Sequence, residues 1–85
     1  MAIHEFTVTA TGLPVDGAEW EYAFYEAGCD DATVMLTGGH FLLFFDREAV
    51  SYDDAVRTAR EDIERAGAKV ISMEAGNGLE GRRPR

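Results

Sequence analysis

The sequence contains one cysteine, two prolines and no long hydrophobic run. Cys29 has no second thiol, which excludes an internal disulfide and a cysteine-based zinc site. A chain without disulfides fits a reducing compartment, so we expect a cytoplasmic protein. No stretch reaches the ~18 apolar residues of a membrane span, and the start "MAIHEF" lacks the features of a secretion signal. The sequence therefore predicts neither membrane insertion nor export.

Basic residues are scarce outside the last few positions. Sixteen Asp and Glu stand against eight Lys and Arg, for a formal net charge of −8. Three of the eight are Arg82, Arg83 and Arg85, so five basic and sixteen acidic residues leave residues 1–81 at −11. A field of this sign repels phosphate backbones and anionic lipid surfaces. We expect no nucleic-acid binding by the folded part and no membrane partner.

The apolar content is sufficient for one small core. The 85 residues are 46% hydrophobic, which fits a single globular unit rather than a disordered chain. We expect one domain over residues 1–75, followed by a flexible basic tail over residues 76–85, because "AGNGLEGRRPR" is rich in Gly and Arg. A core this small favours self-association, which would cover further apolar surface.

Hydrophobic periodicity and turn residues predict six elements. In the order strand, helix, strand, strand, helix, strand, they cover residues 3–10, 16–28, 32–37, 41–45, 51–67 and 68–74. Asp16 with Glu19, and Ser51 with Asp54, have the spacing of helix N-terminal caps. Two β-α-β units with right-handed crossovers give a four-stranded antiparallel sheet of order 4-1-3-2, with both helices on one face. The predicted fold class is α+β, ferredoxin-like βαββαβ.

The strand over residues 41–45 is apolar at every position, although a strand with one solvated face alternates. A two-residue turn at Gly38-Gly39 fixes the hairpin register, and opposed residues share a face. The face predicted to lie under the helices holds Phe6, Val8, Val34, Leu36, Phe41, Leu43, Phe45, Ile71 and Met73. The opposite face, called the outer face below, is predicted to hold Met35, Leu42 and Phe44 among Thr7, Thr9, Thr33 and Thr37.

Three large apolar side chains on the outer face need a cover. Burying Met35, Leu42 and Phe44 would contribute about 1.5–3 kcal/mol each relative to exposure, and no predicted element remains to bury them. We therefore predict a protein interface, in its simplest form a homodimer. Its predicted residues are Met35, Leu42, Phe44, Thr7 and Thr33. The alternative is that a monomer tolerates scattered apolar residues on a sheet face.

Candidate metal ligands are few. His4 and His40 begin antiparallel strands, so they lie at opposite ends of the sheet and cannot share a metal. Glu5, Asp31 and Asp46 fall at one end of the outer face, where three carboxylates can bind a hard cation. Acidic turn residues are common in so acidic a chain, and a divalent site needs more oxygen ligands. This hypothesis stays open, and we predict no metal and no cofactor.

No catalytic pattern is evident in the sequence. Asp30 and Asp31 next to Cys29 are expected to raise the pKa of its thiol and weaken it as a nucleophile. No base–nucleophile pair, GxGxxG or P-loop pattern occurs, so we predict no catalytic residue and no enzyme. Tyr22 and Tyr25 lie off the apolar stripe of the first helix, either as a contact surface or as packing at the helix rim.

Two segments, "EAGCDDATV" (residues 26–34) and "FDREAVSYDDAVRTAREDIERAGAKVISME" (residues 45–74), carry a family resemblance. They are similar to the N-terminal domain of small bacterial helix-turn-helix regulators and antitoxin-like proteins, in which a βαββαβ domain precedes the DNA-reading helices. The resemblance covers most of residues 20–74. It implies a domain for association or sensing that dimerises, pairs with a full-length relative or holds a toxin-like partner. Because the chain ends eleven residues after Glu74, we expect no DNA binding of the family type.

Together these patterns predict a non-enzymatic, regulatory protein-interaction module that acts through the outer face. Its partner is a second copy of the chain or another protein. The alternative is a small-ligand-sensing domain whose binding site lies at a dimer interface.

Overall fold

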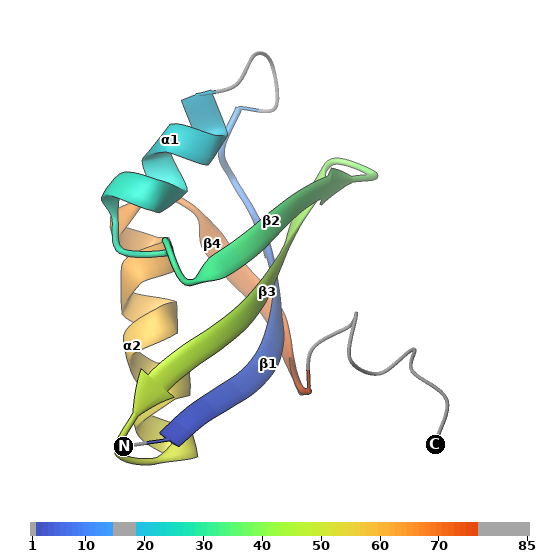
Figure 1. Cartoon of the computed structure of the whole chain (residues 1–85). Helices are drawn as coiled ribbons and strands as arrows, with labels where there is room; N and C mark the ends of the chain where they lie inside the picture. Colours follow the sequence, from blue (N-terminus) through green and yellow to red (C-terminus); the bar gives the residue numbers. More distant parts are fainter. Residues whose placement is uncertain (1, 15–18, 77–85) are drawn as a thin grey trace.

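The computed structural model describes residues 2–14 and 19–76. Its elements are β1 (Ala2–Thr11), α1 (Glu19–Glu26), β2 (Ala32–Thr37), β3 (His40–Ala49), α2 (Tyr52–Arg65) and β4 (Lys69–Ala75). The strands form one antiparallel sheet in the order β2-β3-β1-β4, with both helices on the same side (Figure 1). The α+β class and the strand order 4-1-3-2 are therefore confirmed. Asp16 of the predicted cap, and the predicted tail beyond Gly76, lie outside the described residues.

The β2–β3 hairpin follows from its glycine pair. Gly38 and Gly39 have φ values of 57° and 79°, a left-handed conformation that only glycine adopts freely and that a type I′ turn needs at both positions. The turn pairs Thr37 with His40, and Met35 then lies opposite Leu42. The predicted hairpin register is therefore confirmed.

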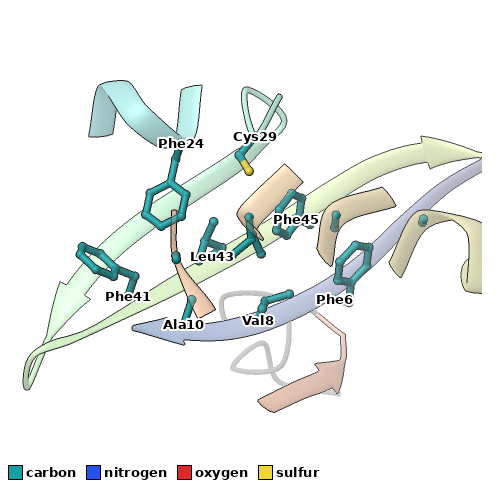
Figure 2. Close-up of a cluster of buried hydrophobic side chains, with 12 residues drawn as sticks. Phe6, Val8, Ala10, Phe24, Cys29, Phe41, Leu43 and Phe45 are labelled. Carbon is teal, nitrogen blue, oxygen red and sulfur yellow. The ribbon is translucent and has the colours of Figure 1, made fainter. Parts of the chain in front are cut away.

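The core lies between the sheet and the helices. It joins inner-face residues of β1 and β3 to side chains of both helices, namely Phe6, Val8, Ala10, Phe24, Phe41, Leu43, Phe45, Ala55, Ala59 and Ile63 (Figure 2). Phe6 stacks on Phe45 with ring centroids 5.0 Å apart, and the Phe41 ring lies 5.3 Å from both Trp20 and Phe24. Four of the largest fully buried side chains are therefore phenylalanines, namely Phe6, Phe24, Phe41 and Phe45.

Helix α2 begins and ends as its sequence predicts. The Ser51 hydroxyl accepts a hydrogen bond from the Asp54 backbone N–H at 3.1 Å, which satisfies one of the free donors of the first turn. The buried residues Ala55, Ala59 and Ile63 recur at intervals of four and turn one helix face toward the sheet. Gly67, with a φ of 101°, then reverses the chain into β4.

Two sequence-based expectations about the sheet are wrong. Strand β3 continues past Phe45 to Ala49, and its inward position 47 is occupied by an arginine. The pairing of β1 with β4 shifts between Thr9 and Ala10, so that Val70 and Met73 pack against the core. Ile71 lies at this shift and is 50% exposed, which removes it from the predicted inner face.

Candidate functional site

The outer face brings the five predicted interface residues together. Thr33, Phe44 and Thr7 form one row across β2, β3 and β1, and Met35 and Leu42 belong to the next row. Because side chains alternate along a strand, these rows lie on the opposite side of the sheet from Phe45 and Leu43. The Thr7 hydroxyl donates to the Gly76 carbonyl at 3.0 Å, which ties the end of β4 to this face.

The three large side chains of the outer face differ in accessibility. Met35 is 45% exposed and Leu42 is partly buried, whereas Phe44 is only 5% exposed. The expectation of a solvent-accessible Phe44 is therefore wrong. Phe44 is buried apart from the main cluster, which consists of inner-face and helix residues. The apolar surface open to a partner is centred on Met35 and Leu42.

The three predicted carboxylates do not form a cation site. Glu5 lies opposite Asp46 in the sheet, and the Asp46 N–H donates to the Asp31 carbonyl at 3.1 Å, so the backbones are adjacent as expected. The Asp31 carboxylate, however, binds Arg47. Within residues 2–14 and 19–76, no group of three His, Cys, Asp or Glu side chains is placed to hold a metal ion. The positive charge next to the Asp31 carboxylate is thus that of Arg47.

The main polar feature of the interior is Arg47, which is 7% exposed. Its Nε and Nη2 donate to the two carboxylate oxygens of Asp31 at 2.8 and 2.9 Å. Nη2 also donates to the Gly28 carbonyl at 2.8 Å, while Nη1 reaches Thr58 Oγ1 at 3.1 Å and Asp62 Oδ2 at 3.0 Å. These contacts match the five N–H donors of a guanidinium group. Arg47 therefore holds together three segments of the chain.

The charges around Arg47 keep it ionised. Burial by itself lowers its pKa, but the hydrogen bonds and negative charges of Asp31 and Asp62 outweigh burial and raise the pKa.

Asp62 also accepts from Arg65 at 2.7 Å, and Arg65 donates to the Ala27 carbonyl at 2.8 Å. The end of α1 is thus fixed to α2 by two arginines. The signal for this arrangement was present in the sequence, because strand alternation turns residue 47 inward with Phe45.

Gly28 is the residue that lets α1 approach this cluster. Its φ of 113° lies in the region that disfavours other residues. A Cβ at this position would also meet Asp62 Oδ2 at 2.8 Å, inside contact distance. Gly28 therefore acts as a helix stop, as predicted, and also leaves room for the carboxylate that binds Arg47.

Cys29 is buried rather than poised for chemistry. It is 2% exposed, and its pKa is raised from 9.0 to about 12, mainly by burial and then by the charge of Asp62, with Arg47 opposing. The predicted direction was correct. The predicted cause was secondary, because Asp31 and Asp30 contribute less than burial and Asp62. A thiol in this state is a poor nucleophile at neutral pH.

The two histidines lie at opposite ends of the sheet, His4 in β1 and His40 in β3, as predicted. His4 lies opposite Arg47 in the register, where its Nε2 is 3.3 Å from the Ala49 carbonyl and its ring meets Tyr52 edge-on at 6.1 Å. His40 follows the hairpin turn and is exposed. The two histidines are therefore too far apart in the sheet to bind the same metal ion.

A groove separates α1 from the edge strand β2. Its volume is about 460 Å³, and its lining comprises Glu21, Tyr22, Phe24, Tyr25, Cys29, Asp30, Ala32 and Val34. Tyr22 and Tyr25 are 67% and 63% exposed, which disagrees with the alternative that they pack at the helix rim; the alternative of a contact surface stays a prediction. Sequence periodicity did not predict this groove, because the groove depends on how α1 and β2 lie relative to each other in the folded chain.

A scan against protein-family models found no match. Searches of curated proteins and of solved structures found no significant match either. None of the six elements described above is a helix long and apolar enough to cross a membrane.

Proposed function

We propose that this chain is a non-enzymatic protein-interaction module with a regulatory, antitoxin-like role, and that it forms a homodimer through the outer face. The observation that carries the proposal is the exposed Met35 beside Leu42, on the side of the sheet opposite both helices. We also assign the βαββαβ order to the ferredoxin-like class, on the basis of its strand order and the common side of its helices.

The charge pattern of the outer face supports pairing with a second copy. The rows Thr33–Phe44–Thr7 and Met35–Leu42–Thr9 carry no charge, although the chain as a whole carries −8. Glu5, Asp46 and Glu74 lie at the margins of these rows. An uncharged centre within a charged rim is typical of protein interfaces. Two copies can therefore meet at this face without opposing like charges at its centre.

The dimer is tested by placing a charge on the exposed part of the face. Leu42→Glu and Met35→Glu are expected to weaken dimerisation by about tenfold or more, because each buries a carboxylate in the interface. Val50→Glu is the matched control, since Val50 is 68% exposed and lies between β3 and α2. Sedimentation equilibrium of all three variants and of the unaltered chain measures the dissociation constants.

Two outcomes contradict the proposed dimer. One is an unaltered chain that sediments as a monomer at every concentration tested. The other is a dimer whose dissociation constant changes equally in Leu42→Glu and Val50→Glu, because that result would show a general charge effect. Circular dichroism of each variant verifies that the fold is retained.

A further inference from the structure

The two edges of the sheet differ in how they are protected against pairing with another strand. Edge strand β4 contains Lys69 and Glu74 and pairs across a register shift, three features that discourage strand addition. Edge strand β2, residues 32–37, has no charge, no proline, no glycine and no register shift. An unprotected edge is a template for a further strand. The β2 edge is therefore the place where strand addition is easiest.

The hairpin register determines which backbone groups of β2 face outward. Residues that flank a two-residue turn exchange hydrogen bonds with each other, and such pairs alternate along the ladder. Thr37, Met35 and Thr33 thus bond to β3, consistent with Asp31 accepting from the Asp46 N–H. Val34 and Leu36 direct their N–H and C=O groups away from β3. Two residues are consequently available to a strand added at this edge.

The groove beside β2 gives an added strand a place for its side chains. Ala32 and Val34 of the inner face line the groove together with Tyr22 and Tyr25 of α1. A strand paired with β2 would turn alternate side chains to the inner side. Those side chains would enter the groove and cover the two exposed tyrosines. Apolar, β-branched side chains suit a lining of aromatic rings and Val34.

The charge of this region determines the class of partner. Residues 19–39 hold five acidic residues and no Lys or Arg. Glu21 and Asp30 line the groove, whereas Asp31 is already neutralised by Arg47. A second copy paired at this edge would bring the same acidic segment against itself. A strand that carries Lys or Arg would instead be attracted to both carboxylates.

We propose that β2 and the adjoining groove bind an extended segment of another protein, which has apolar side chains for the groove and Arg or Lys at either end. The segment adds a fifth strand to the sheet at Val34 and Leu36. This inference goes beyond the proposed dimer, because it uses the edge of the sheet and α1 rather than the outer face. Both surfaces can be occupied at once.

The probe is the peptide RTVTVTR, acetylated and amidated, in which the arginines and valines share one face when extended. We expect it to bind the full chain with a Kd below about 1 mM and to shift the backbone amide resonances of Val34 and Leu36. The peptide ETVTVTE should bind about tenfold more weakly or not at all, because its carboxylates oppose Glu21 and Asp30. Raising the salt concentration should weaken binding of the peptide RTVTVTR, because salt screens its attraction to the carboxylates.

Val34→Pro tests strand addition directly. Proline removes the outward N–H of Val34 without removing a bond to β3, so we expect binding to weaken by about tenfold or more. Val34→Ala, which keeps the N–H but shortens a side chain of the groove lining, is the matched control and should weaken binding less than Val34→Pro does. A peptide N-methylated on the residues that face β2 should fail to bind the unaltered chain, which tests the same bonds without any substitution.

Several outcomes overturn the proposal. They are the absence of binding by RTVTVTR, equal binding of ETVTVTE, and binding that survives both Val34→Pro and N-methylation. If Val34→Pro lowers the oligomeric mass of the protein in solution, a second copy of the chain is the occupant of the β2 edge. That result also overturns the proposal. Leu42→Glu should leave peptide binding unchanged, so failure of the outer-face dimer is distinguishable from failure of this inference.

Discussion

The inner face of β3 has an aromatic end and an ionic end. Phe41, near the start of the strand, packs against Trp20 and Phe24 at ring distances of 5.3 Å. Arg47, six residues further on the same face, is held by charge-assisted hydrogen bonds. Aromatic packing depends mainly on buried area and tolerates small displacements, whereas hydrogen bonds require specific directions. The aromatic end therefore provides stability, and the ionic end positions the segments around it.

The positional role of the ionic end is visible in what Arg47 contacts. Its partners are Gly28 and Asp31, both in the loop between α1 and β2, and Thr58 and Asp62 of α2. Burying such charges costs desolvation free energy that their attraction only partly offsets. The cluster is accordingly better explained by the fixed path of the loop than by a large net stabilisation. That loop leads directly into β2, the edge strand beside the groove.

The largest expected effect lies at the aromatic end. Phe41→Ala should lower the free energy of unfolding by about 3–5 kcal/mol, because it leaves a cavity next to Trp20 and Phe24. Urea unfolding followed by Trp20 fluorescence measures this loss. The loss should change little with salt concentration. A loss below about 1 kcal/mol would show that the aromatic end is not the main source of stability.

A somewhat smaller effect is expected at the ionic end. Arg47→Met should lower the free energy of unfolding by about 3 kcal/mol, because Asp31 loses its cation and Asp62 keeps only its ion pair with Arg65. Adding Asp31→Leu and Asp62→Leu to the same chain should recover part of the loss, since no carboxylate is then left unpaired. Urea unfolding of the single and triple variants measures both changes. A triple variant less stable than Arg47→Met would contradict the assignment of cost to unpaired carboxylates.

The smallest expected effect is confined to alkaline pH. The raised pKa of Cys29 keeps its thiol neutral in the folded chain, whereas the unfolded chain ionises near the ordinary value of 9.0. Stability from this group is complete below pH 9 and falls as the pH rises from 9 toward about 12. Urea midpoints measured across this range should fall more steeply for the unaltered chain than for Cys29→Ala. Parallel curves would show that the thiol does not contribute.

Local patterns in the sequence were sufficient for the hairpin and for α2. The Gly38-Gly39 pair predicts a two-residue turn, and a turn of that length sets every pair between β2 and β3. Ser51 and Asp54 locate the start of α2 because the cap depends on residues three apart. These features involve neighbours in the chain, so a single sequence encodes them directly.

Features that depend on distant segments were not predictable in the same way. The register shift that exposes Ile71 arises from the pairing of β1 with β4, and local alternation does not reveal it. The ion pairs of Arg47 with Asp31 and Asp62 form only when the loop after α1, β3 and α2 come together in the folded chain. Phe44 was assigned to the correct face, but its exposure depends on the whole fold. The groove beside β2 belongs to the same class of feature.

The strand order has a consequence for synthesis on the ribosome. Of the six elements, β1 is made first and lies between β3 and β4, so one of its two neighbours is the last of the six to be translated. At about 5–20 residues per second, β1 waits for several seconds before β4 emerges. The hairpin of β2 and β3 can form during this interval, but one side of β1 stays open. Translation pauses within residues 52–75 would prolong the lifetime of that half-closed sheet.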